Sequence, residues 1–196
     1  LAQVAMRKLT RADIRGPQLY AAIRDDLRKR VIEIKRARRV SVGPQVTIVF
    51  ENRATMIFQG EEMWRAESIL QPEKIQDELD IYNKILPDEG QLGATLLVEI
   101  TDEAQIATTL ERLVGLQAHV WLVVGGERVK GEFDPEQFKS DKLAAVQYLK
   151  FSLSATAQKA LETAGTAVAL SIDHPNYRHE ARLGEPSRAS LAEDLS

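Results

Sequence analysis

The stretch His119-Val-Trp-Leu-Val-Val-Gly-Gly-Glu-Arg-Val-Lys-Gly-Glu-Phe133 contains the clearest fold signal in this chain. Gly125-Gly126 is the strongest hairpin turn, because glycine adopts the positive φ angles of a two-residue loop without strain. The arm before the turn is apolar throughout, whereas the arm after it alternates around Val129. We therefore expect residues 119–124 to form an interior strand and residues 127–133 to form its antiparallel partner.

The rest of the chain alternates between helical and extended patterns, with Pro and Gly at the breaks. Pro17 suits the first turn of a long helix, whose apolar stripe runs from Leu19 to Ile34. Residues 46–51 and 54–58 are rich in β-branched and aromatic residues, so we expect a β-hairpin with Asn52-Arg53 as its turn. Further strands are predicted at 94–100, 144–151 and 166–172, and further helices at 59–70, 72–86, 101–115, 154–164 and 186–195. The helix over 72–86 carries an apolar stripe of Ile75, Leu79, Tyr82 and Leu86, and the strand over 166–172 has Val168, Leu170 and Ile172 on one face.

These elements predict an α+β fold. A chain of 196 residues is long enough for one hydrophobic core. We expect a single domain over residues 1–196, with a mostly antiparallel sheet flanked by helices and an N-terminal helical and β-hairpin portion. Residues 1–7 are expected to be a disordered or non-native extension of this domain.

Composition excludes several kinds of chemistry. The chain has no cysteine, which excludes disulfides, thiolate catalysis, and cysteine-ligated zinc or iron–sulfur centres. None of the three histidines follows a glutamate by three residues, so the Glu-x-x-His pairs of di-iron bundles are absent. The apolar runs are far shorter than a membrane span, and no cleavage-type signal sequence is present. We expect a cytoplasmic protein without a cofactor, a metal site or a membrane attachment.

Charge is distributed unevenly along the chain. Residues 1–40 hold twelve Lys/Arg and four Asp/Glu, a net of +8, whereas the whole chain has a net charge of −3. This basic segment either binds an anion or nucleic acid, or is a solvated face that can dock on acidic surface of the same chain. We favour the second interpretation and expect no sequence-specific nucleic-acid binding, because no nucleic-acid motif accompanies the charges. The candidate anion-binding residues are Arg28, Lys35, Arg36, Arg38 and Arg39.

The hexapeptide Asp173-His-Pro-Asn-Tyr-Arg178 gathers several functional groups directly after a predicted strand. Pro175 biases His174 towards an extended backbone, and a neighbouring carboxylate can orient the imidazole ring. His174 is therefore either a general base or metal ligand, or part of a turn whose polar groups satisfy the backbone. We expect His174 and Tyr177 on one side of the turn, facing a concavity lined partly by residues 46–58. The candidate site comprises Asp173, His174, Asn176 and Tyr177, with Glu51, Asn52 and Glu67 as partners from elsewhere in the chain.

Motifs spread over most of the chain match one family. They are Lys8-Leu-Thr-Arg-Ala-Asp-Ile14, Val42-Gly-Pro44, Phe50-Glu-Asn-Arg53 with Thr55, Glu62-Met63 with Arg65-Ala-Glu67, Tyr82-Asn83, Ala94-Thr-Leu96, Val146-Gln-Tyr148 and Asp173-His-Pro-Asn-Tyr177. From about Lys8 to the C terminus, the chain resembles a group of mainly bacterial proteins, the domain-of-unknown-function family 3501. The resemblance implies no biochemical activity. It implies a context in redox or peroxide metabolism, because such proteins are often encoded beside rubrerythrin-like proteins and iron–sulfur oxidoreductases.

Three functions fit these patterns. The leading hypothesis is a non-catalytic accessory protein that binds a redox partner, such as a rubrerythrin-like protein or an iron–sulfur oxidoreductase. The second is an enzyme or small-ligand binder that uses His174, Tyr177 and a carboxylate such as Glu51 or Glu67. The third is an anion or nucleic-acid binder that uses the basic helix of residues 24–39. A large exposed apolar patch would favour the first, and a closed pocket containing His174 and a carboxylate would favour the second.

Overall fold

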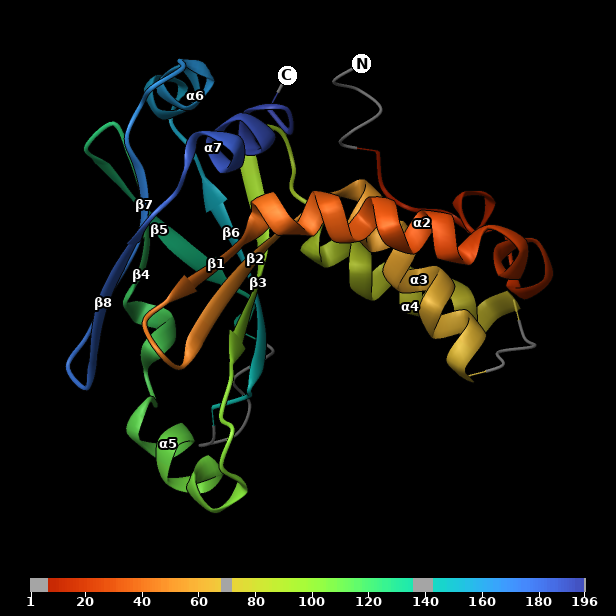
Figure 1. Ribbon diagram of the computed structural model, residues 1–196, viewed down its shortest axis with the longest axis horizontal. Helices are drawn as coiled ribbons and strands as arrows, with labels where there is room; N and C mark the ends of the chain where they lie inside the picture. Colours follow the sequence, from red (N-terminus) through yellow and green to blue (C-terminus); the bar gives the residue numbers. More distant parts are fainter. Residues whose placement is uncertain (1–6, 68–71, 136–142, 196) are drawn as a thin grey trace.

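In the described part of the chain, eight β-strands form one antiparallel sheet, and helices pack at its ends and along one side (Figure 1). The structure is a computed structural model that describes residues 7–67, 72–135 and 143–195. The strand order is β1-β2-β3-β6-β5-β4-β7-β8, and every neighbouring pair is antiparallel. The predicted α+β class is therefore confirmed. The strands are β1 (Arg39–Val42), β2 (Val46–Glu51), β3 (Gln91–Val98), β4 (Val120–Val124), β5 (Glu127–Phe133), β6 (Val146–Ser152), β7 (Val168–His174) and β8 (Tyr177–Arg182).

The Gly125-Gly126 hairpin forms as predicted. The two glycines have φ angles of 57° and 93°, and Val124 pairs with Glu127 directly across the turn. Positive φ at both central residues is what a tight two-residue hairpin of this hand requires. Strand β4 lies between β5 and β7, which confirms that the apolar arm is interior.

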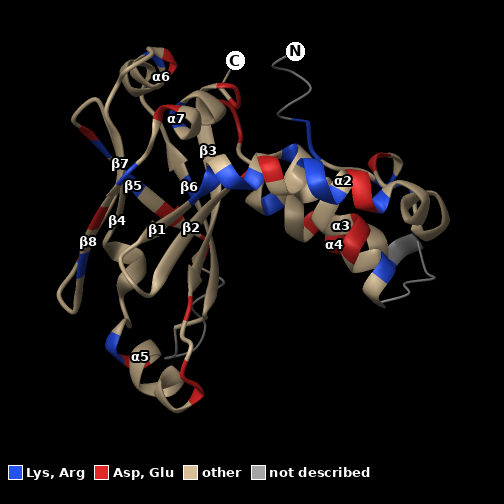
Figure 2. Cartoon of the chain, in the orientation of Figure 1, with Lys and Arg blue, Asp and Glu red and all other residues tan. Residues whose placement is uncertain are grey.

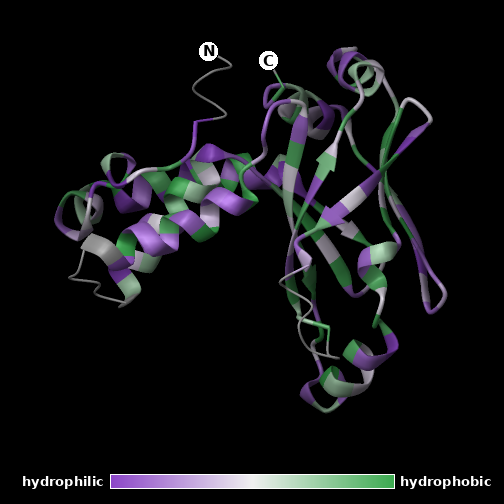
Figure 3. Cartoon of the chain, turned by 180° about the vertical axis from the view of Figure 1, so that it is seen from behind, coloured by the Kyte–Doolittle hydropathy of each residue, from purple (hydrophilic) through white to green (hydrophobic). Residues whose placement is uncertain are grey.

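The sheet curls until its two edge strands, β1 and β8, come into contact without pairing. Because side chains alternate along a strand, each strand has an inward and an outward face. The inward side chains form the larger hydrophobic core, and Figure 3 shows hydrophobic residues along these strands. On β2 and β7 the inward residues are Val46, Ile48, Phe50, Val168, Leu170 and Ile172.

Short helices close the two ends of the curled sheet. Helix α5 (Ile106–Arg112) lies at one end, whereas α6 (Ala155–Glu162) and α7 (Glu185–Ala192) lie at the other (Figure 1). Ser154 caps α6 by accepting a hydrogen bond from the amide of Ala157, as serine at an N-cap does. The described residues also form single-turn 3-10 helices at η1 (Arg11–Asp13), η2 (Glu103–Gln105) and η3 (Leu116–Ala118).

Three longer helices form a lobe that projects sideways from the sheet (Figure 1). They are α2 (Pro17–Arg38), α3 (Arg53–Glu67) and α4 (Pro72–Ile85). The predicted stripe of α4 faces a second, smaller core, where Ile75, Leu79 and Tyr82 are buried. Within the lobe, Glu62 joins α3 to α2, because it accepts hydrogen bonds from Tyr20 Oη at 2.5 Å and Arg24 Nε at 2.7 Å. The Arg24 guanidinium lowers the pKa of Glu62 to about 2.

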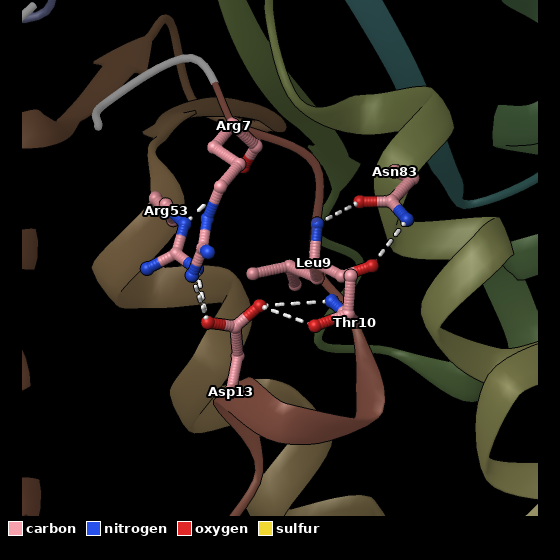
Figure 4. A network of polar contacts seen from close by, with 6 residues as sticks. All are labelled: Arg7, Leu9, Thr10, Asp13, Arg53 and Asn83. Carbon is pink, nitrogen blue, oxygen red and sulfur yellow. Dashed lines mark hydrogen bonds and ion pairs between the residues drawn. The ribbon is translucent and has the colours of Figure 1, made fainter. Parts of the chain in front are cut away.

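The segment before α2 ties α3 to α4 (Figure 4). Asn83 of α4 accepts a hydrogen bond from the amide of Leu9 and donates one to the Leu9 carbonyl, at 2.6 and 2.9 Å. Asp13 accepts hydrogen bonds from Thr10, Arg7 and Arg53 of α3. Without these contacts, the backbone groups and charges of this short segment would lack hydrogen-bond and ion-pair partners. In the described part of the chain, no helix is long and apolar enough to cross a bilayer.

The predicted hairpin over residues 46–58 is wrong in its second arm. Residues 54–58 belong to α3, and β2 pairs instead with β1 across the Gly43-Pro44-Gln45 turn. Asn52 and Thr55 cap α3 reciprocally, since each side chain bonds the backbone amide of the other. This local capping, together with buried Met56, Gly60 and Trp64 at helical spacing, outweighs the β propensity of the segment.

Other predicted boundaries also change. The basic helix ends at Arg38, and Arg39 begins β1. Leu19 and Ile23 belong to the predicted apolar stripe of this helix, but they are exposed, because Tyr20 and Arg24 face α3 instead. The hexapeptide was expected as a turn after residue 172. It is the tight end of a hairpin, since β7 runs to His174 and β8 starts at Tyr177.

Candidate functional site

His174 and Tyr177 are cross-strand neighbours at the β7–β8 turn. Both side chains are buried on the inward face of the sheet. The structure therefore brings them together on one side of the turn. What they contact decides whether this end of the sheet can bind a ligand.

Both ring nitrogens of His174 bond the protein backbone. Nε2 lies 3.0 Å from the carbonyl oxygen of Val114, and Nδ1 lies 3.2 Å from the amide nitrogen of Asn176. A backbone carbonyl only accepts hydrogen bonds, so Nε2 must carry a proton. A backbone amide only donates them, so Nδ1 must be unprotonated, and the ring is neutral. His174 thus fixes the loop after α5 to the β7–β8 turn, and both ring nitrogens are used in doing so.

The Tyr177 hydroxyl joins the two edges of the curled sheet. It donates to the carbonyl of Val42 at 2.7 Å and accepts from the amides of Gln45 and Val46 at 3.0 and 3.1 Å. Gly43 has a φ of 78°, and a Cβ there would lie 2.6 Å from this hydroxyl. The turn between β1 and β2 therefore needs glycine for its backbone angle and for the approach of Tyr177.

Asp173 points to the opposite, outward face, because neighbouring residues of a strand alternate. Its carboxylate accepts hydrogen bonds from Arg128 at 2.8 Å and Trp121 at 3.1 Å, and His119 Nδ1 lies 3.1 Å away. The bond from Arg128 lowers the pKa of Asp173 to about 2. Asp173 therefore orients Arg128, Trp121 and His119 rather than His174. Asn176 donates to the carbonyl of Arg112 at 2.9 Å.

The partners expected from elsewhere in the chain lie apart from His174. Tyr177 meets β2 at Val46, whereas Glu51 is at the other end of this strand, roughly 16 Å away at about 3.3 Å per residue. Glu51 also points outward, towards the helical lobe, and Asn52 caps α3. The side chain of Glu67 lies outside the described residues.

Glu51 instead lines a cavity of about 400 Å³ between the sheet and the helical lobe. This volume is within the usual range for small-molecule sites. The outward faces of β2, β3 and β6 form one wall, and α2, α3 and α4 form the other. The lining is mainly apolar and aromatic, with a few polar groups. The lining includes Lys35, Arg39, Glu51, Met56, Met63, Glu78, Ile81, Ile85, Thr95, Val146 and Tyr148.

Glu51 is the most deeply buried carboxylate in this cavity, with 4% of the residue exposed. Thr95 donates a hydrogen bond to its Oε1 at 3.2 Å. Its Oε2 is buried and accepts no hydrogen bond from the described residues. Lys35 Nζ lies 3.7 Å from Oε2, which is close enough for an ion pair but too far for a hydrogen bond. The carboxylate thus retains one open acceptor inside an apolar site.

The basic helix uses most of its candidate anion-binding residues within the chain. Lys35 faces Glu51, Arg36 pairs with Glu33 on the same helix, and Arg39 pairs with Glu99. Arg38 is buried and binds Asp194 after α7. Figure 2 shows acidic residues beside basic ones along this helix. Arg28 is exposed. This arrangement supports the interpretation that the basic face docks on acidic groups of the same protein.

Within the described residues, no group of three or more His, Cys, Asp or Glu side chains is arranged to hold a metal ion. The cavity was not predicted from the sequence, except for Glu51 itself. Thr95 and Tyr148 are directly opposite each other on β3 and β6. Both side chains alternate outward along their strands, and this pattern could have indicated the cavity wall. It would have done so only if the pairing of β3 with β6 had been known.

The fold and the cavity define an α+β protein with a helical lobe packed against one outer face of a curled antiparallel sheet. The chain belongs to the family described as protein of unknown function (DUF3501), whose model matches residues 8–195. This confirms the family resemblance found in the sequence.

One solved structure is similar over almost the whole chain. It is described as a novel protein of unknown function from Burkholderia pseudomallei K96243 and is 36% identical, with a TM-score of 0.91. The match covers 97% of this chain and 100% of that one. A comparison with curated proteins finds no match. These relatives establish the family and the fold, and their descriptions name no activity.

Proposed function

We propose that this protein binds a small organic molecule in the cavity between the sheet and the helical lobe, with Glu51 as the polar anchor. The observation that supports this most strongly is the buried Oε2 of Glu51, which accepts no hydrogen bond from the described residues. A buried acceptor left without a hydrogen bond costs about 1–3 kcal/mol of stability. A ligand that donates a hydrogen bond there would recover this cost, and such locally unfavourable groups concentrate at functional sites.

The surrounding surface is suited to the same role. Met56, Met63, Ile81 and Ile85 present apolar side chains from two helices, and methionine adapts its shape to different ligands. An apolar pocket with a few convergent polar groups is the usual form of a small-molecule site. The proposal retains the small-ligand hypothesis and Glu51, but it moves the site away from His174 and Tyr177. A cytoplasmic location, expected from the lack of cysteine, is part of the proposal.

The proposal predicts that ligands perturb two methionines. We expect aliphatic amines, alcohols or carboxylates of four to eight carbons, as one or more classes, to shift the 13C-methyl NMR signals of Met56 and Met63 saturably. Each signal is assigned by a Met→Leu replacement. Val146→Trp, at a half-exposed position on the cavity wall, should abolish the shifts by filling the site. Lys130→Trp, at an exposed position of β5, is the matched control and should retain them. If neither methyl signal responds to any class, the proposal is wrong.

A redox accessory role is the second candidate function. Its support is the family context together with Leu19 and Ile23, which are one turn apart on α2 and are exposed by 68% and 38%. Exposed apolar groups of this kind can contact a protein partner. The role predicts that a rubrerythrin-like protein or an iron–sulfur oxidoreductase co-purifies from the native host. It fails if neither is recovered, or if Leu19→Asp leaves the recovery unchanged.

A further inference from the structure

We propose that the ligand of the Glu51 cavity is an organic amine, bound as its ammonium form with an apolar body; this rests on the proposed function. The anchoring atom is Glu51 Oε2, which is buried and lacks a hydrogen-bond donor among the described residues. A carboxylate only accepts hydrogen bonds, so the ligand must supply the donor. A donor that is also positively charged forms the stronger, charge-assisted bond.

A second carboxylate adds negative potential to the same space. Glu78 of α4 lines the cavity with Glu51 of β2, so the two charges approach the site from opposite walls. The effect of both is visible at Tyr148: burial, and then the charges of Glu51 and Glu78, raise the pKa of its hydroxyl. Two carboxylates facing one low-dielectric cavity favour a cation and disfavour an anion there.

The cations of the lining do not cancel this preference. Arg39 binds Glu99, which is outside the cavity. Lys35 lies 3.7 Å from Glu51 Oε2, and a third of its side chain is exposed. A long lysine side chain can move its ammonium into solvent while its stem stays on the protein surface. An incoming ammonium would therefore replace Lys35 in front of Glu51 and come within hydrogen-bonding distance.

The remaining walls suit the body of an amine. Tyr148 provides an aromatic ring, whose negative face attracts an ammonium group. Met56, Met63, Ile81 and Ile85 form an apolar surface for an alkyl or aryl chain. Polar recognition is thus concentrated at the Glu51 end, and the rest of the ligand is held by burial.

Isothermal titration with three probes of equal chain length tests the amine assignment. The probes are hexylammonium chloride, hexan-1-ol and sodium hexanoate, at neutral pH and low salt. We expect hexylammonium to bind about tenfold or more tightly than the other two, as one charge-assisted hydrogen bond allows. Glu51→Gln should remove this advantage and leave hexanol binding unchanged. Lys35→Met, which removes the competing ammonium, should strengthen hexylammonium binding severalfold.

Glu180→Gln, an exposed carboxylate of β8 outside the cavity, is the matched control and should change nothing. Equal binding of hexylammonium and hexanol, insensitive to Glu51→Gln, would overturn the amine assignment while the cavity remained a ligand site. Tightest binding of hexanoate would overturn it too, because Lys35 would then be the anchor. Failure of all three probes to bind, with silent Met56 and Met63 signals, would remove the proposed function itself.

Discussion

Replacing Arg38 with Met is expected to lower the free energy of unfolding by about 3–5 kcal/mol, the usual cost of removing one partner of a buried ion pair. Only 1% of Arg38 is exposed. Its guanidinium donates to both carboxylate oxygens of Asp194, at 2.6 and 2.8 Å, and to the carbonyl of Ser190 at 2.6 Å. The replacement leaves the Asp194 carboxylate without its cation and opens the junction between α2 and α7.

Urea denaturation measures this loss, and Arg36→Met provides a matched control two residues earlier on the same helix. Arg36 is exposed and pairs with Glu33 on the surface, so its replacement should change stability by about 0.5 kcal/mol or less. Equal midpoints for the two variants would show that Arg38 does not hold α2 to α7. The comparison also bears on the basic segment, because an anion-binding role for Arg38 would not predict a large loss of stability.

His174→Ala is expected to destabilise the protein by about 3 kcal/mol. The change removes the hydrogen bonds to the Val114 carbonyl and the Asn176 amide, which contribute about 0.5–1.5 kcal/mol each, and it leaves a cavity in place of a buried ring. It also removes an imidazole ring whose centroid lies 5.3 Å from the ring centroid of His119. The variant that remains folded should still bind hexylammonium with unchanged affinity, because His174 does not line the Glu51 cavity.

His179→Ala is the control for this prediction. His179 is exposed, and the centroid of its ring lies 4.5 Å from the ring centroid of Tyr177. Its replacement should lower the free energy of unfolding by about 1 kcal/mol or less. Denaturation curves and the amine titration are measured on both variants. A His174→Ala protein with native stability but no ligand binding or no cellular function would contradict the structural role and restore His174 as a functional residue.

Local patterns predicted much of the fold. The Gly125-Gly126 turn, the buried stripe of α4 and the inward face of β7 each depend on neighbours in sequence, and all three are present. The error over residues 54–58 came from weighing β-branched and aromatic composition above the Asn52–Thr55 capping pair. Strand β8 was missed because its exposed, charged residues give little hydrophobic alternation, as is common at a sheet edge.

The candidate site was harder to predict, because its parts meet only through long-range packing. The sequence singled out both Glu51 and His174, but it placed them together, whereas β2 contacts Tyr177, the neighbour of His174, at Val46 and carries Glu51 at its other end. The cavity forms only where the outward faces of β2, β3 and β6 meet side chains of α2, α3 and α4. No spacing within one segment encodes that arrangement. The hydrogen bonds of His174 likewise involve the loop after α5, sixty residues away in the chain.

A crystal structure of the protein soaked in hexylammonium chloride would show whether the Glu51 cavity is a ligand site. We expect electron density for the amine between the sheet and the lobe, with its nitrogen about 2.7–3.2 Å from Glu51 Oε2. Lys35 should be turned towards solvent, and the alkyl chain should lie against Met56 and Met63. A cavity without amine density, or an amine bound only beside His174 and Tyr177, would contradict the account.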